Sequence, residues 1–359
     1  MNYWVTEPNA SLESGYPYWN EGASGKARFD VANGIKEVLD ANKLYTYVYN
    51  WPEEPEDYFG RRFDGLLGGA KRDDIFFIQW PLSYTSDEYV QHLYDRIKGL
   101  GGRIVTVIHD LDSWRHPINF NEQRLQNVLA NLNQSDGIIV HSKPMQERLE
   151  QDFRAHGLEH QPYFVILDLF GFQTVRNQYD WQHPFNREID YAGNLVKAQF
   201  IKALSTDLKF NIYGQTDAAD LSDQQRQNIK FQGSYDHEAI PQVLTGSFGL
   251  VWSSDSYPGV TGLTGEYERY NAPHKASMYL AADEPLIVAR QAAIAPFVEK
   301  HGIGLVVDDL SQLKEAIDQL SEAEYHEMAE RTHRIGNLIR QNFPIKRAVI
   351  EMIAKLEWN

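Results

Sequence analysis

Apolar and polar positions change along the chain with the periods of strands and helices. In the first half, short apolar runs rich in β-branched and aromatic residues predict strands, and the segments between them show the three-to-four-residue spacing of amphipathic helices. The predicted strands lie at residues 3–7, 45–50, 73–80, 103–110, 136–142 and 163–170. The predicted helices lie at 27–42, 86–101, 121–134 and 143–157.

A polar and aromatic stretch without any period, residues 171–188, interrupts this alternation and predicts a linker. The alternation then restarts, with strands at 188–194, 209–215, 230–234, 249–255, 285–290 and 304–309. Helical patterns lie at 197–205, 219–228, 237–247, after Pro273, at 292–302 and in a long C-terminal tail. Continuous apolar strands alternating with helices are typical of parallel sheets covered on both faces.

This order predicts an α/β protein with two Rossmann-like, doubly wound domains. We expect the first domain at 1–175 and the second at 186–344, with the last helix, 345–359, crossing back to the first domain. The carboxyl ends of the strands of two such domains would face each other across a cleft. Open α/β sheets bind their ligands at that end of the strands.

The composition of the chain excludes several kinds of partner and of catalytic site. The 359 residues are 42% hydrophobic and 23% charged, as in an ordinary soluble globular protein, and the net charge of −16 argues against nucleic acid or anionic lipid as a general partner. The absence of cysteine excludes disulfides, thiolate metal sites and a cysteine nucleophile, and it fits a reducing compartment. No signal peptide or membrane span is evident, so we expect a cytoplasmic protein.

The stretch YNAPHKASMYLAADEPLIV, residues 270–288, holds an unusual lysine. Lys275 falls in the first turn of a predicted helix, where the positive end of the helix dipole disfavours a cation. A bound phosphate between the lysine and the free N–H groups would explain it, and the 15-residue Gly-containing loop before the helix, 256–270, suits closure on a ligand. The predicted donor site on this helix comprises His274, Lys275, Ala276, Ser277 and Met278. The plainer alternative is a lysine that extends into solvent.

Three other turns offer ligand contacts. Asn194 and Lys197 follow a strand and open the next helix, and Ser234 with Tyr235 could hold and cover the edge of a base. The Gly/Ser-rich segment 13–29 follows the first strand, and its Ser24 and Gly25 could donate to a diphosphate or a sugar. Each of these positions could equally be an ordinary turn, a solvated helix start or a surface loop.

The first domain offers His109 and Asp110 directly after the strand at 103–110. A histidine and a carboxylate at the end of a strand suit general base chemistry, with Asp110 as the preferred base, or they form a structural hydrogen-bonded pair. A metal site with Asp112 and His116 matches no closed motif. The chain contains no P-loop, GxGxxG or GxSxG motif, which argues against nucleotide hydrolysis of that type, dinucleotide chemistry and a Ser-His-Asp hydrolase.

Taken in order along the chain, these motifs resemble a known family. The segments FGLVW (248–252), YNAPHKASMYLAADEPLIV and FVEKHGIGLVV (297–307) resemble GT-B glycosyltransferases. The likeness is greatest to the bacterial family that includes the glucosyltransferase of streptococcal serine-rich-repeat adhesins and galactofuranosyltransferase-like relatives. It extends along nearly the whole chain, although each motif alone is weakly specific.

The resemblance implies a UDP-sugar donor held mainly by the second domain. Family members use a basic residue after the Gly-Asn turn, here Lys197, together with positions matching Ser234, Tyr235 and Lys275, and a hydroxyl near Ser24. The sequence departs from the pattern of this family at three places. Lys197 replaces an expected arginine, so the bidentate contact of a guanidinium with a phosphate is lost. His274 occupies a position where tyrosine is common, and the loop at 13–26 is longer. The resemblance further implies a GlcNAc-modified serine-rich adhesin as acceptor, and a homo-oligomer.

From these observations we expect a hexosyltransferase that moves glucose or N-acetylglucosamine from UDP without a metal or other cofactor. The alternatives are a galactofuranosyl or other hexosyltransferase of cell-surface polysaccharide synthesis, a non-catalytic nucleotide-sugar-binding accessory subunit, and a hydrolase or epimerase of UDP-sugars. The sequence does not distinguish an inverting from a retaining reaction.

Overall fold

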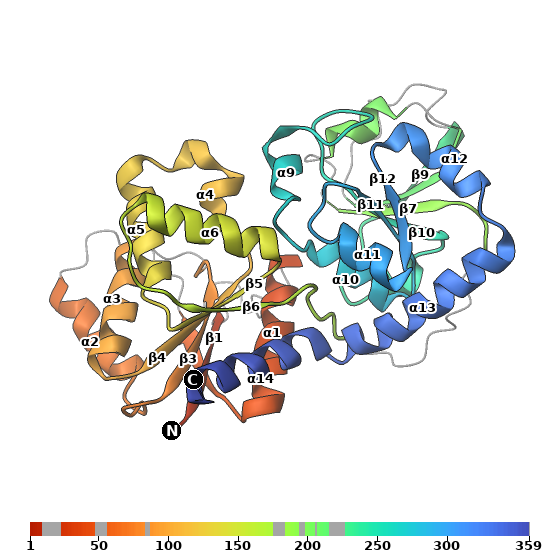
Figure 1. Ribbon diagram of the computed structural model, residues 1–359. Coiled ribbons are helices and arrows are strands. Elements are labelled where there is room, and N and C mark those ends of the chain that lie inside the picture. Colours follow the sequence, from red (N-terminus) through yellow and green to blue (C-terminus); the bar gives the residue numbers. More distant parts are fainter. Residues whose placement is uncertain are drawn as a thin grey trace. The chain divides into compact units, whose positions relative to one another are not determined.

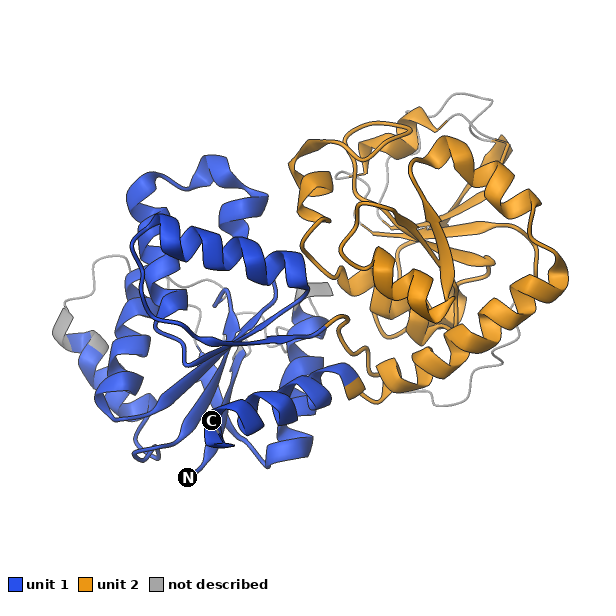
Figure 2. Ribbon diagram, in the orientation of Figure 1, with its two compact units in different colours: residues 1–167, 344–359 blue, residues 168–343 orange. Residues whose placement is uncertain are grey.

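The computed structural model describes residues 1–8, 23–46, 56–82, 87–174, 184–193, 198–204, 207–214 and 227–358. The chain forms two compact units (Figure 2). Unit 1 comprises residues 1–167 and 344–359, and unit 2 comprises residues 168–343.

Unit 1 is a parallel sheet with helices between its strands (Figure 1). Its strands are β1 (Tyr3–Pro8), β2 (Asn42–Thr46), β3 (Ile75–Trp80), β4 (Arg103–Ile108), β5 (Gly137–Val140) and β6 (Tyr163–Ile166). Its helices are α1 (Ala23–Leu39), α2 (Glu56–Leu66), α3 (Asp87–Gly99), α4 (Asp112–Arg115), α5 (Glu122–Asn133) and α6 (Lys143–Ala155), with a 3₁₀ turn η2 (Pro117–Asn119) and most of α14 (Phe343–Trp358).

The strand order in unit 1 is β2-β1-β3-β4-β5-β6, and all pairings are parallel. The chain moves outward in one direction through β2 and in the other through β3 to β6, so right-handed crossovers place α1 on one face and α3, α5 and α6 on the other. The point at which the direction reverses lies between β1 and β3. Strands β3 and β5 are buried along their whole length, as their unbroken apolar sequences predict.

Local sequence explains where the helices begin. In α6 the Ser142 hydroxyl accepts a hydrogen bond from the Met145 N–H at 3.2 Å, and Pro144 occupies the first turn. Met145, Leu149 and Phe153 then repeat at four-residue intervals and are all buried. The helix therefore has both a specific start and one apolar face toward the sheet.

The C-terminal helix α14 completes unit 1. Arg347 Nη2 donates to the carbonyl oxygens of Ile166, at 2.7 Å, and Leu167, at 3.1 Å, which are the last residues before unit 2. Met352 lies directly over Gly137 of β5, where a Cβ atom would come within 2.3 Å of the Met352 sulfur. Gly137 thus allows the end of the chain to pack closely on the first sheet.

Unit 2 repeats the same plan (Figure 1). Its strands are β7 (Ile189–Ala192), β8 (Phe210–Tyr213), β9 (Ile229–Gly233), β10 (Phe248–Val251), β11 (Leu286–Ala289) and β12 (Gly304–Val307). Its helical segments are η4 (Gln199–Ala203), α8 (Ile240–Val243), α9 (Gly262–Tyr267), α10 (His274–Ala281), α11 (Ala295–His301), η6 (Leu310–Gln312), α12 (Leu313–Asp318) and α13 (Glu322–Arg340).

The strand order in unit 2 is β12-β11-β10-β7-β8-β9, again entirely parallel. The direction of progression reverses between β7 and β10, which makes their carboxyl ends the topological switch point of this sheet. The core includes the fully buried aromatic side chains of Phe200, Phe210, Phe248, Trp252 and Tyr279. The predicted class, an α/β protein with two doubly wound units, is confirmed.

Several predicted boundaries were wrong. Helix α1 begins at Ala23, so residues 23–26 are helical and not part of a Gly/Ser loop. The predicted loop 256–270 contains the short helix α9, and the predicted helix at 197–205 is a 3₁₀ turn in its described part. The strand predicted at 45–50 ends at Thr46, and residues 47–50 lie outside the described ranges. Helix α2 was not predicted, because Gly60 and the two consecutive arginines after it, Arg61 and Arg62, interrupt the apolar spacing of a helix.

Candidate functional site

The strands at the switch point of unit 2 separate before they end. β10 pairs with β7 only at Phe248–Ile189 and Gly249–Asp190. Farther along β7, the Gly193 N–H donates to β8, to the Tyr213 carbonyl at 3.0 Å, while the Ala192 N–H on the other side donates to the Tyr279 hydroxyl at 2.7 Å. The Tyr279 hydroxyl thus accepts the hydrogen bond of an N–H group that no longer has a partner in β10. The sheet opens at its carboxyl edge, the side on which its parallel strands end.

Gly249 allows α10 to lie close enough for this bond. A Cβ atom at Gly249 would lie 2.2 Å from Cγ of Tyr279, far inside contact distance. The Tyr279 ring is fully buried, and burial raises the pKa of its hydroxyl well above the usual value, so it remains a neutral donor and acceptor. The absence of a side chain at Gly249 therefore allows α10 to pack closely against the sheet.

Lys275, in the first turn of α10, lies over the end of β7. Its Nζ is 4.4 Å from the centroid of the Tyr191 ring and donates to the Tyr191 hydroxyl at 3.3 Å. A Cβ atom at Gly193 would be 3.4 Å from the same Nζ, so the ammonium lies directly beside the turn that follows β7. Cation–π contact and the hydrogen bond hold a half-buried positive charge at the switch point.

Glu268 adds a buried acid near this lysine. Its side chain is 2% exposed, and within the described part of the chain neither carboxyl oxygen accepts a hydrogen bond of ordinary geometry. Burial raises the pKa of Glu268 to about 8. Weak hydrogen bonds from Ser253 and the positive charge of Lys275 lower this pKa by smaller amounts. The acid is therefore mostly protonated at pH 7, so it does not neutralise the charge of Lys275, and this charge can attract an anion.

The other predicted residues of α10 differ in accessibility. Ala276, Ser277 and Met278 are buried, and the Ser277 hydroxyl donates to the Phe170 carbonyl at 2.9 Å within unit 2. The His274 ring is half-buried against Phe172, with ring centroids 5.1 Å apart. Lys275 is thus the member of this set whose charged group lies at the carboxyl edge of the sheet.

Two of the remaining predicted donor contacts follow β9 at the same edge. Ser234 and Tyr235 follow β9 and are exposed, with the Tyr235 ring 6.1 Å from that of Tyr213. Gly233 before them has a φ of +95°, which favours glycine at this turn. Asn194 and Lys197 lie outside the described residues, so the structure gives no placement for them.

In unit 1, the predicted residues lie at the carboxyl edge of the sheet. Ser24 and Gly25 belong to the first turn of α1, directly after the segment that follows β1, and Gly25 is buried. His109 and Asp110 follow β4, and Asp110 Oδ2 accepts from Arg115 Nη1 at 2.9 Å. His109 Nε2 lies 2.7 Å from Gln79 Oε1, at the end of the neighbouring strand β3.

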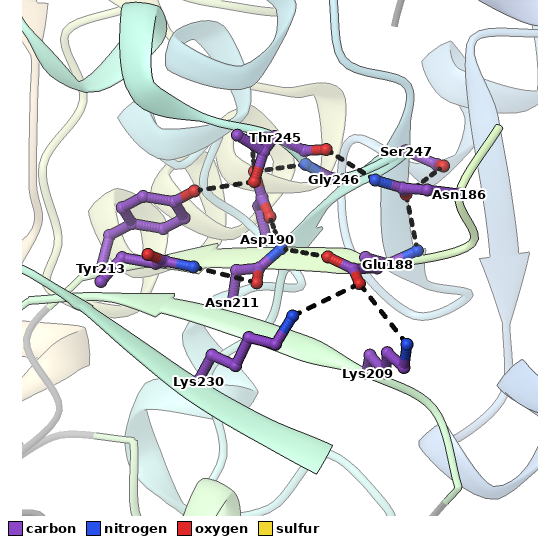
Figure 3. Close-up of polar contacts among 11 residues, drawn as sticks. Asn186, Glu188, Asp190, Lys209, Asn211, Tyr213, Lys230, Thr245, Gly246 and Ser247 are labelled. Atoms are coloured by element: carbon purple, nitrogen blue, oxygen red, sulfur yellow. Dashed lines mark hydrogen bonds and ion pairs between the residues drawn. The ribbon is translucent and has the colours of Figure 1, made fainter. Parts of the chain in front are cut away.

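The opposite, amino edge of the unit 2 sheet carries a separate polar network (Figure 3). Asp190 accepts from Asn211 Nδ2 at 2.9 Å and from the backbone N–H groups of Thr245, at 2.8 Å, and Gly246, at 2.9 Å. Burial and the nearby Asp190 raise the pKa of Glu284 well above its usual value, so this acid is neutral. Because the network lies where β7, β8 and β10 begin, it anchors these strands and takes no part in a ligand site at their other ends.

Sequence reasoning missed Tyr191, Glu268 and Gln79 as members of these sites. A buried glutamate in a polar loop and a glutamine inside an apolar strand carry no periodic signal that separates them from their neighbours. Among the described residues, no three His, Asp or Glu side chains gather as metal ligands would. Within the same residues, none of the helices combines the length and the hydropathy that a membrane-spanning helix needs.

Comparisons with known proteins agree over both units. The model of the "glucosyltransferase 3-like, N-terminal domain" matches residues 2–167, and that of the "glucosyltransferase 3-like, C-terminal domain" matches residues 189–352. Glucosyltransferase 3 of Streptococcus gordonii is 24% identical over 340 residues, covering 92% of this chain and 94% of the relative. The beta-1,6-galactofuranosyltransferase WbbI of Escherichia coli (strain K12) is 27% identical over 300 residues, covering 81% and 83%.

Solved structures share the fold. A glycosyltransferase from Rickettsia africae ESF-5 aligns with a TM-score of 0.57 at 11% identity, covering 100% of this chain and 99% of the other. A chain of the GtfA/B complex aligns with a TM-score of 0.52 at 15% identity; the match covers 87% of this chain, which spans 63% of that one. At such identities the likeness concerns the fold alone, and it confirms the predicted GT-B class.

Proposed function

Because this chain belongs to the glucosyltransferase 3-like family, we propose that it transfers a hexose, glucose or N-acetylglucosamine, from a UDP-sugar to a glycan on a serine-rich protein. Transfer of a glycosyl group is the activity that both curated relatives carry in their names. The donor nucleotide, the sugar and the acceptor are our proposal, and we expect the reaction to need no metal or other cofactor.

The observation that carries the proposal is the position of Lys275. Its ammonium lies beside Gly193 at the switch point, on the first turn of α10, where backbone N–H groups also favour an anion. The departing UDP carries increasing negative charge on its diphosphate as the bond to the sugar breaks. A cation that is already held in place by Tyr191 stabilises that charge without further reorganisation.

Unit 1 supplies the acceptor side in this proposal. The Asp110 carboxylate is already engaged by a cation, because its Oδ2 pairs with Arg115 Nη1 at 2.9 Å. We therefore favour His109 over Asp110 as the group that takes the proton from an acceptor hydroxyl in an inverting reaction. A retaining reaction would place a smaller demand on either residue.

A galactofuranosyl donor is the second candidate, because WbbI is 27% identical to this chain. The test is incubation of the protein with UDP-glucose, UDP-N-acetylglucosamine and UDP-galactofuranose, each with a GlcNAc-bearing Ser-rich peptide, followed by mass spectrometry of the peptide. A gain of one hexose from UDP-glucose, or of one N-acetylhexosamine from UDP-N-acetylglucosamine, supports the proposal, whereas a gain of one hexose from UDP-galactofuranose alone supports the second candidate. UDP binding without a mass gain from any donor would favour a non-catalytic accessory subunit instead.

A further inference from the structure

Gln79, the penultimate residue of β3, is held rigidly at the carboxyl edge of the unit 1 sheet. Its side chain is 1% exposed, and its backbone N–H donates to the Thr6 hydroxyl at 2.9 Å. Arg28 of α1 holds the same strand end, with Nη1 donating to the Gln79 carbonyl at 3.1 Å and Nη2 to the Pro81 carbonyl at 2.6 Å. The position of the glutamine is therefore fixed from both neighbouring elements.

The hydrogen bonds of the Gln79 amide define its orientation. Nε2 lies 2.7 Å from the Thr6 carbonyl oxygen, which can only accept, so the NH₂ group must face Thr6. The opposite orientation would bring two oxygens together inside a buried site. The amide oxygen Oε1 consequently points to His109, whose Nε2 lies 2.7 Å away.

This orientation decides the protonation of the histidine. An amide oxygen has no hydrogen to donate, so the hydrogen between Oε1 and the imidazole must belong to His109 Nε2. A bare Nε2 would place its lone pair against that of Oε1. The neutral ring therefore carries its hydrogen on Nε2, and Nδ1 is the nitrogen that gains and loses a proton.

We infer that Gln79 is a positioning residue, which holds His109 in the Nε2–H tautomer and so assigns proton exchange to Nδ1. The inference rests on the proposed function in one respect only, the task given to Nδ1, which is to accept the proton of the acceptor hydroxyl. Gln79 itself, buried behind the histidine in this network, touches no substrate. The chain Thr6–Gln79–His109 thus extends from a strand backbone to the reactive nitrogen.

The direct test observes the tautomer without any need for activity. Two-bond ¹H–¹⁵N correlation spectra of the uniformly labelled protein are recorded above the pKa of His109, and the signals that disappear in His109→Gln identify its ring. We expect a protonated Nε2 and a bare Nδ1. A bare Nε2 with a protonated Nδ1, or equal populations of both forms, would overturn the inference.

A variant tests the role of Gln79. In Gln79→Met the oxygen is lost, so we expect His109 to populate both tautomers. The kcat should fall in proportion to the lost Nε2–H population, about twofold for equal populations, with little change in KM for the donor, because a base with the wrong nitrogen protonated accepts no proton. Gln91→Met, in α3, removes an exposed amide bonded to Asp95 at 2.8 Å and should change neither quantity.

A Gln79→Met protein with an unchanged single tautomer would refute the positioning role. If this variant does not fold, the spectrum of the unsubstituted protein still decides the tautomer. If the unsubstituted protein shows the Nε2–H tautomer but transfers no sugar, the proposed function fails while the assignment of the proton stands.

Discussion

Replacement of Lys275 by methionine tests the proposed anion site most directly. Methionine keeps an unbranched apolar side chain but removes the ammonium that lies 4.4 Å from the Tyr191 ring centroid. A hydrogen bond to a charged group contributes about 1.5–3 kcal/mol. Since 1.4 kcal/mol corresponds to a factor of ten in affinity, Lys275→Met should raise the Kd for UDP roughly 10- to 150-fold.

The expected loss concerns binding more than folding. The cation–π contact with Tyr191 contributes about 0.5–2 kcal/mol to the folded state, and part of it is replaced by contact of the methionine with the same ring. The neighbouring Glu268 is already largely neutral, because burial raises its pKa to about 8. Removal of the lysine therefore leaves no fully charged, buried partner behind.

Isothermal titration of UDP at two salt concentrations measures the effect. The unsubstituted protein should bind more weakly at high salt, and Lys275→Met should show a smaller salt dependence. Lys314→Met serves as the matched control, because this helix lysine of the same unit pairs with Asp318 at 2.5 Å on the exposed surface. If Lys275→Met and Lys314→Met both bind UDP within twofold of the unsubstituted protein, Lys275 does not contact the diphosphate and the reasoning fails.

Three further predictions concern the surroundings of this lysine. Because the pKa of Glu268 is raised from 4.5 to about 8, the folded protein keeps a proton that the unfolded chain loses, so stability should fall by up to about 1.4 kcal/mol per pH unit between pH 5 and 8. Glu268→Gln should flatten this slope in urea titrations at a series of pH values, and an unchanged slope would contradict a neutral acid. Tyr279→Phe leaves the Ala192 N–H without its acceptor and should cost about 1–3 kcal/mol in urea unfolding; an unaltered midpoint would count against that bond. Gly249→Ala places a Cβ atom 2.2 Å from Tyr279 and should destabilise by about 1–3 kcal/mol or more, whereas Gly259→Ala, with nothing within 4 Å, serves as control; equal effects would argue against the close packing.

The sequence predicted the strands well because buried parallel strands have an unbroken apolar pattern. β3 and β10 illustrate this, since every residue of both is buried. Helix starts were less accurate where their first turns are small and polar. In α1 the residues Ala23, Ser24 and Gly25 have the composition of a loop, so local propensity does not reveal their helical conformation.

Conflict between residue type and position was one signal that the sequence offered for candidate residues. Lys275 became a candidate because a cation is unfavourable at a helix start. Glu268 gave no such signal, because a glutamate in the segment GEYERY is ordinary, and only the fold shows that it is buried. Gln79 was missed for the converse reason, since a polar residue inside an apolar strand does not reveal from sequence which groups it bonds.

The two edges of the unit 2 sheet can tolerate change to different degrees. Asp190 and its partners join three strands at the amino edge, so replacements there affect the folding of the whole unit. The loops at the carboxyl edge carry the candidate ligand contacts, and the strands there have already separated. If the carboxyl edge binds the sugar donor as proposed, segment 252–275 is the part of the unit in which specificity could change while the scaffold at the amino edge stays the same.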